Sequence, residues 1–106
     1  MSTKLPSQYE SIRKRFKAYS KAADNLGKAT KAAGPLNEKA SQLVQLAASA
    51  AIRSEGAVHS HTRRALAAGV KPEEIYHAII LLSSTIGFPT VSAALSWADD
   101  IIQKRK

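Results

Sequence analysis

One alanine-rich stretch, residues 42–69, constrains the fold of this chain more than any other part of the sequence. It runs QLVQLAASAAIRSEGAVHSHTRRALAAG: an apolar segment, a polar break at residues 53–56, and a second segment that carries two histidines. Alanine and leucine are strong helix formers, and glycine commonly follows the last turn of a helix. The stretch therefore predicts two helices that fold back on each other as a central antiparallel hairpin.

The ends of these two hairpin helices can be placed from capping residues. Asn37 is expected to cap the first helix, because an asparagine side chain accepts a hydrogen bond from the first turn. The second helix is expected to begin at Ser54 or Glu55 and to end at Ala68, before Gly69.

Apolar periodicity predicts three further helices, which gives an all-α fold of about five helices. The first covers residues 7–27, with its stripe at Tyr9, Ile12, Phe16, Tyr19 and Ala23. The fourth begins at Pro72 and continues to Ile86, and its apolar side is broad enough for a central position or a subunit interface. The fifth begins at Pro89, with its stripe at Val91, Leu95, Ala98 and Ile102 and with Trp97 off that stripe.

The length of 106 residues predicts one domain over residues 1–106, with a basic N-terminal helix (1–33) and a core (34–103). The chain contains no cysteine. Disulfides, thiol redox cycles and cysteine-based zinc sites are therefore excluded.

Positive charge is concentrated at the N-terminal end of the chain. The net charge is +8, and residues 1–31 hold eight Lys or Arg against Glu10 and Asp24. A basic arm of this kind can contact nucleic acid, but no recognised nucleic-acid-binding motif accompanies it. We therefore expect a solvated basic helix face, and nucleic-acid binding through residues 1–31 is the less favoured alternative.

No segment of the sequence predicts a membrane protein or a secreted one. The N-terminal residues MSTKLPSQYESIRKRF lack the apolar core of a signal peptide. No apolar run approaches the ~20 residues that a membrane span requires. A cytoplasmic location without membrane contact is expected.

Three segments resemble the carboxymuconolactone decarboxylase / alkylhydroperoxidase D-like family. They are SQLVQLAASAA (41–51), HTRRALAAGVKPEEI (61–75) and GFPTVSAAL (87–95). The resemblance runs in order from about Pro35 to Ile102 and implies the helical fold of alkylhydroperoxidase D. It also implies a homo-oligomer, a trimer or a hexamer, with no cofactor and no metal.

The thiol-peroxidase branch of that family is related to the peroxiredoxins in activity and uses a Cys-x-x-Cys pair and a glutamate. The resemblance places the two cysteines at Ser54 and Ala57 and the glutamate at Gln42, so the motif is degenerate here. Without a thiolate there is no nucleophile that reduces a peroxide. Only His61 of that relay is retained, and thiol-peroxidase activity is excluded.

The decarboxylase branch lacks the cysteines and keeps a histidine at the position of His61. Loss of CO₂ from a small carboxylate requires an acid that protonates the developing carbanion and cations that hold carboxylates. The resemblance makes His61 the candidate catalytic acid/base. The candidate substrate-binding residues are His59, Arg53, Arg63, Gln42, Glu55 and Ser54.

Each candidate also has a purely structural interpretation. Ser54 fits the N-cap of a helix better than a nucleophile, and the arginines fit surface or interface ion pairs. Glu55 lies one turn before His59 and is placed to orient it. His59 and His61 are two residues apart on a helix and point away from each other, so no metal site is expected.

Two functions from different classes follow. The first is a cofactor-independent lyase that acts on a small carboxylate, with His61 as acid/base. The alternative is a catalytically silent, oligomeric binding or scaffold protein of the same family. Retention of His61 and its neighbouring arginines favours the first function. Loss of the cysteines and of the glutamate favours the second.

Overall fold

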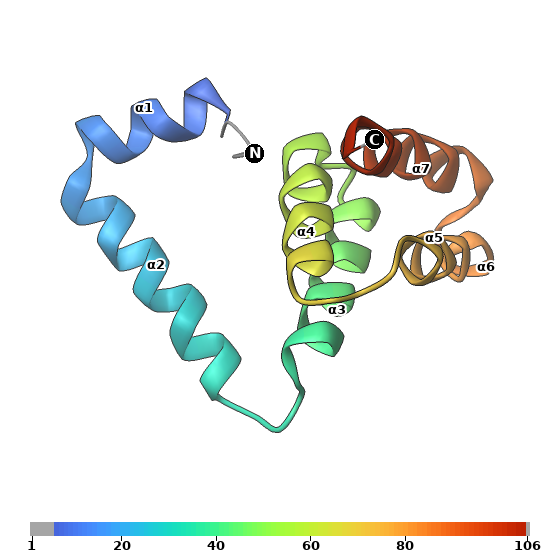
Figure 1. Cartoon of the computed structure of the whole chain (residues 1–106), viewed down its shortest axis with the longest axis horizontal. Helices are drawn as coiled ribbons and strands as arrows, with labels where there is room; N and C mark the ends of the chain where they lie inside the picture. The colour runs from blue at the N-terminus through green and yellow to red at the C-terminus, as the bar shows by residue number, and fades with distance from the viewer. Residues whose placement is uncertain (1–5, 106) are drawn as a thin grey trace. The chain divides into compact units, whose positions relative to one another are not determined.

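The computed structural model describes residues 6–105, and every regular element among them is helical (Figure 1). By internal contacts the chain divides into two compact units, Met1–Pro35 and Leu36–Lys106. The all-α prediction is confirmed. Two of the five predicted helices are each divided in two, which accounts for the larger number of elements observed.

The N-terminal unit holds α1 (Ser7–Arg15) and α2 (Lys17–Ala32). The prediction of a single helix over residues 7–27 is wrong in two respects. Phe16 leaves the helical conformation (φ −127°, ψ 67°), and α2 continues through Gly27 to Ala32.

An ion pair within the N-terminal unit accompanies this break. The Arg13 guanidinium donates two hydrogen bonds to the Asp24 carboxylate, at 3.0 and 2.7 Å. In one continuous helix two residues eleven positions apart would be separated by about 16 Å along the axis. The bend at Phe16 brings them together, and the carboxylate raises the pKa of Arg13. Tyr9, Phe16 and Tyr19 are exposed, so the predicted stripe forms no buried face.

The hairpin of the second unit consists of α3 (Glu38–Ala51) and α4 (Glu55–Ala67), which pack against each other. Asn37 caps α3 as predicted, because its side chain accepts a 2.8 Å hydrogen bond from the Ala40 amide. The return begins at Arg53, which adopts the left-handed conformation (φ 58°). Its amide donates to the Ala50 carbonyl and the Ser54 amide to the Ser49 carbonyl, both at 3.0 Å. This pair of bonds is the Schellman motif, with arginine at the position that glycine usually takes.

The remaining elements are α5 (Pro72–Ile80), α6 (Ser83–Ile86), α7 (Phe88–Ile102) and a 3₁₀ turn, Gln103–Arg105. α5 begins at Pro72 as predicted, and the Glu74 carboxylate accepts a 2.8 Å hydrogen bond from the Lys71 amide. The predicted helix from Pro72 to Ile86 is wrong in its continuity, because a tight turn at Leu81–Leu82 separates α5 from α6. This turn lets Leu82 and Ile86 pack against the same core as α5.

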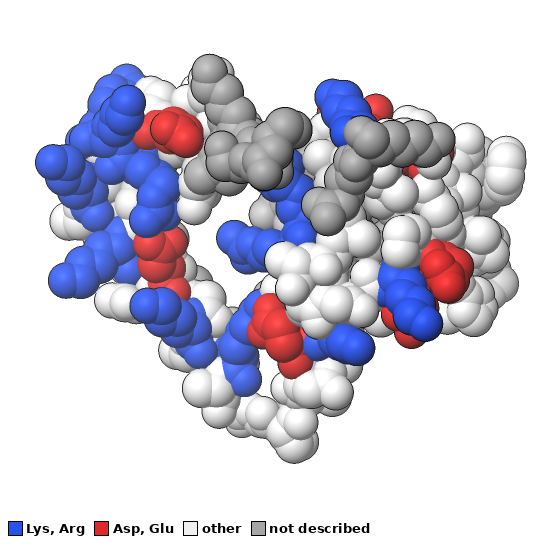
Figure 2. All heavy atoms as spheres, viewed as in Figure 1, with Lys and Arg blue, Asp and Glu red and all other residues white. Residues whose placement is uncertain are grey.

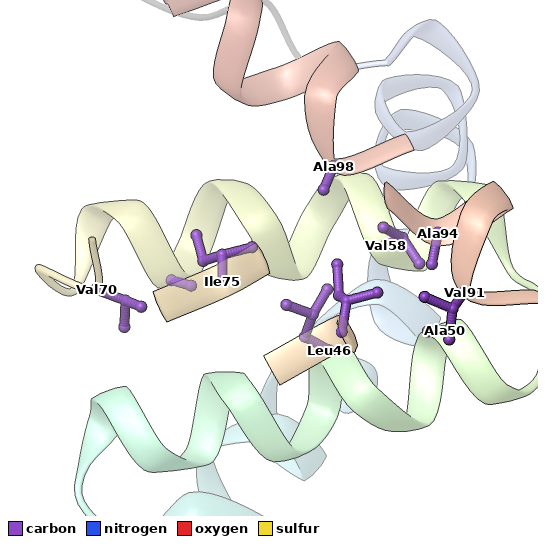
Figure 3. Close-up of a cluster of buried hydrophobic side chains, with 10 residues drawn as sticks. Leu46, Ala50, Val58, Val70, Ile75, Val91, Ala94 and Ala98 are labelled. Atoms are coloured by element: carbon purple, nitrogen blue, oxygen red, sulfur yellow. The ribbon is translucent and has the colours of Figure 1, made fainter. Parts of the chain in front are cut away.

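The core of the second unit lies between α3, α4, α5 and α7 (Figure 3). Small residues from α3, α4 and α7 let these helices approach closely, and larger side chains fill the space between them. The buried apolar residues are Leu46, Ala50, Val58, Ala65, Val70, Ile75, Ile79, Val91, Ala94 and Ala98.

This core bears on two sequence expectations. Ile75 and Ile79 are fully buried within the chain, so they are not available for a subunit interface. Trp97, placed off the stripe of the last helix, packs against the core at partial exposure. None of the helices within residues 6–105 is long and apolar enough to cross a membrane.

Candidate functional site

A chain of side-chain hydrogen bonds connects α3 with α4 through His61. The Nδ1 atom of His61, on α4, lies 2.9 Å from the Oε1 atom of Gln42 on α3. The Nε2 atom of Gln42 donates to the Glu38 carboxylate at 2.8 Å, one helical turn earlier. The structure thus brings together two sequence-predicted site residues, His61 and Gln42. Sequence reasoning missed Glu38 as a member of the chain.

The roles of the atoms in this chain follow from what each group is able to donate. A carboxylate only accepts hydrogen bonds, so the NH₂ group of Gln42 must face Glu38 and its carbonyl oxygen must face His61. The Nδ1 atom of His61 therefore carries the hydrogen of that contact. In the neutral imidazole this assigns the lone pair to Nε2, the atom that can take up a proton or deliver one.

Burial makes this arrangement rigid. Gln42 is 1% exposed, whereas His61 is half-buried. A buried amide that lost its partners would leave polar atoms unsatisfied at a cost of about 1–3 kcal/mol. Gln42 is therefore held by both neighbours, and the imidazole of His61 is held at Nδ1.

Polar atoms without a partner also lie on these two facing helices. Among residues 6–105, two buried side-chain oxygens have no hydrogen-bond partner: Gln45 Oε1 on α3 and Thr62 Oγ1 on α4. Gln45 lies one turn after Gln42 on the same helix. The amide of Gln42 has hydrogen-bond partners for both its oxygen and its nitrogen, whereas the Oε1 atom of Gln45 has none. These residues form part of a polar seam between α3 and α4.

Ser54 and Arg53 take structural positions at the tip of the hairpin. The Ser54 hydroxyl accepts a 3.3 Å hydrogen bond from the Ala57 amide and caps α4, as the alternative interpretation of this residue predicted. The Arg53 guanidinium donates a 2.8 Å bond to the Thr90 hydroxyl on α7. Since a hydroxyl carries no charge, the charge of Arg53 remains uncompensated by this contact.

His59 and Glu55 lie together, as their spacing predicted, and a residue that sequence reasoning missed joins them. The Nε2 atom of His59 lies 4.0 Å from the Glu55 carboxylate and 2.9 Å from the Asp100 carboxylate on α7. Asp100 is forty-one residues from His59 in sequence, so only the packing of α7 on α4 reveals it. Arg63 is half-buried on α4, and its side chain forms no ion pair within residues 6–105.

Tyr76 forms a second polar contact between helices, from α5 to α7. Its hydroxyl donates a 2.6 Å hydrogen bond to the Asp99 carboxylate, and the Gln103 side chain donates to the Tyr76 oxygen at 3.3 Å. The bond to Asp99 and partial burial raise the pKa of Tyr76 above its usual value of 10.0.

The basic side chains of the N-terminal unit form a separate feature. Figure 2 shows Lys and Arg over α1 and α2, interrupted by few acids. Asp24 is one of these acids and is paired with Arg13. Lys14, Arg15, Lys17 and Lys21 are all exposed on this unit.

Comparison with protein families gives one match. A family model described as "Carboxymuconolactone decarboxylase family" matches residues 17–100, which is most of the chain. The curated proteins and the solved structures give no match.

Proposed function

Because the chain belongs to the carboxymuconolactone decarboxylase family, we propose that it is a cofactor-independent decarboxylase-like enzyme acting on a small carboxylate, with His61 as acid/base. The observation that carries this proposal is the Glu38–Gln42–His61 chain of hydrogen bonds. It holds the imidazole of His61 at Nδ1 through a buried amide, so the proton transfer is assigned to Nε2. Gln42 then acts as a positioning residue and not as a base.

The chemistry asked of His61 is a single proton transfer. When the C–C bond to a carboxylate breaks, CO₂ leaves and the electron pair stays on the substrate carbon. A protonated His61 donates the Nε2 proton to that carbon, and a proton from solvent restores the imidazolium. General acid catalysis of this kind typically contributes about 10²–10⁴-fold in rate.

The substrate carboxylates need cationic partners, and Arg53 and Arg63 are the candidates for that role. Neither Arg53 nor Arg63 is neutralised by a carboxylate within residues 6–105. Guanidinium binds carboxylate through two parallel hydrogen bonds, which fixes orientation as well as charge. We assign the anchoring role to Arg53 and Arg63. The His59 imidazole is engaged by Asp100, and Ser54 and Glu55 support the start of α4.

The experiment is a decarboxylation assay with carboxymuconolactone and the full chain, in which CO₂ release and loss of the lactone are followed together. The wild type is expected to release one CO₂ per lactone consumed, without added cofactor. His61→Gln should lower the rate by at least about 10²-fold. His77→Gln, which changes an exposed histidine on α5, is the matched control and should keep the wild-type rate.

A second candidate function is the catalytically silent, oligomeric family member. The exposed apolar side chains at the end of α5 and the start of α7 favour it: Ile80, Leu81 and Phe88 are 50, 63 and 70% exposed. Ile80 and Leu81 are adjacent in sequence, and contiguous exposed apolar side chains are typical of protein interfaces. We propose self-association into a trimer or hexamer for either function. A folded wild type that assembles but turns over no lactone would favour the silent member. A monomer at micromolar concentration would remove the scaffold alternative.

A further inference from the structure

We propose that Glu55, His59 and Asp100 form a binding site for a divalent transition-metal ion. This site is separate from the hydrogen bonds that join Glu38, Gln42 and His61. One nitrogen and two carboxylate oxygens from these residues all lie within 4.8 Å of one another. They come from two helices, α4 and α7, that pack against each other. The inference does not depend on the proposed decarboxylase function.

The distances between the donor atoms fit one ion. Zinc binds imidazole nitrogen and carboxylate oxygen at about 2.0–2.2 Å, so two ligand atoms in a tetrahedral shell are about 3.3 Å apart. The observed separations of 2.9 Å (His59 Nε2 to Asp100) and 4.0 Å (His59 Nε2 to Glu55) lie on either side of that value. Small side-chain rotations would therefore bring all three atoms onto one metal shell.

The positions of the residues in the fold support a preformed site. Glu55 and His59 are one turn apart on α4 and point the same way, as helical ligand pairs do. The side chains of His59, Asp100 and Glu55 are 23, 45 and 59% exposed. His59 is thus held by packing, while the two carboxylates lie nearer the surface, where an ion can enter.

Charge and donor type indicate which ion the site accepts. Two carboxylates and a neutral imidazole carry a charge of −2 together, in a chain whose net charge is +8. Imidazole combined with carboxylates suits zinc and related first-row ions, whereas magnesium and calcium prefer oxygen ligands alone. Three protein ligands leave at least one coordination position for water, so the site is of the open type.

Metal binding changes the protonation of His59 in a defined way. Without metal, the Nε2 atom donates its hydrogen to the Asp100 carboxylate. The metal–Nε2 bond forms as the Nε2–H bond breaks. A neutral ring then carries its hydrogen on Nδ1, and an imidazolium releases one proton to solvent.

The test is calorimetric titration of the untagged full chain, stripped with a chelator, with ZnCl₂ as the probe. One Zn²⁺ per chain is expected, with no corresponding heat from MgCl₂. His59→Gln and Asp100→Asn should each weaken Zn²⁺ binding by about 10-fold or more. His77→Gln and His61→Gln, which change the other two histidines, should bind Zn²⁺ like the wild type.

Nuclear magnetic resonance of the histidine rings keeps the inference testable if a variant fails to fold. In the wild type, Zn²⁺ should change the His59 ring signals and leave the His61 and His77 ring signals unchanged. Two results would overturn the proposal. One is a His59 signal unchanged at excess Zn²⁺. The other is Zn²⁺ binding that survives both His59→Gln and Asp100→Asn. Either would leave His59 as the partner of two carboxylates in an ion pair only.

Discussion

The Nδ1 atom of His61 lies 2.9 Å from the Oε1 atom of Gln42, across the α3–α4 hairpin. In the thiol-peroxidase branch that the sequence resembles, a glutamate stands at the position of Gln42. Here the carboxylate is one turn earlier, at Glu38, and reaches the imidazole through the amide of Gln42. The Gln42 amide orients the His61 imidazole but brings no charge to it, because an amide does not ionise at neutral pH.

Gln42→Leu is expected to destabilise the fold, and Gln45→Leu is its matched control. Loss of the Gln42 amide removes the hydrogen bond at Nδ1 of the half-buried His61, at an expected cost of about 1–3 kcal/mol in unfolding free energy. Gln45, one turn later on the same helix, has an unpaired Oε1 atom. Its replacement should change the unfolding free energy by less than ~0.5 kcal/mol or stabilise the chain. Urea denaturation of both variants checks this, and equal costs would contradict it.

Neighbouring isoleucines on α5 test the position of the core. Ile79 is fully buried, whereas Ile80 is 50% exposed. Ile79→Ala should cost about 2–5 kcal/mol in unfolding free energy, because it removes buried methylenes and leaves a cavity. Ile80→Ala should cost less than half as much in the monomer. Thermal or chemical denaturation measures both. A larger cost for Ile80→Ala than for Ile79→Ala would show that the wrong face of α5 has been assigned to the core.

The Tyr76–Asp99 contact predicts a pH dependence at alkaline pH. The hydrogen bond raises the pKa of Tyr76 in the folded chain above its unfolded value. The folded state then holds the phenol proton more tightly. The resulting stabilisation is complete below about pH 10 and is lost as pH rises through the folded pKa. Tyr76→Phe should be less stable than the wild type at neutral pH, and this difference should shrink on going to higher pH. Denaturation curves with a constant difference across that range would contradict the assignment.

Much of the second unit could be predicted from the sequence, because its signals are local. Asn37 and Ser54 cap their helices, Pro72 starts α5, and Gly69 follows α4, all as the residues indicated. Capping depends on side chains within one turn of the helix end, so it is visible in a short window. The hairpin followed from two apolar segments joined by a short polar break.

The parts that the sequence did not reveal depend on contacts between distant residues. The break at Phe16 is accompanied by the Arg13–Asp24 pair. The sequence did not show this break, because the amphipathic pattern continues past Phe16. The division between α5 and α6 lies at two leucines, which are good helix formers. Asp100 joins His59 only after α7 packs on α4, and Glu38 joins His61 only through Gln42.

The measurement that tests the central claim most directly is long-range ¹H–¹⁵N NMR of the His61 ring, with and without carboxymuconolactone. It reports which nitrogen carries the hydrogen and which one meets the ligand. The expected result is an Nδ1–H tautomer for the neutral ring, a change at Nε2 when the lactone is added, and loss of the tautomer preference in Gln42→Leu. A ring that carries its hydrogen on Nε2, or one that does not respond to the lactone, would contradict the role given to His61.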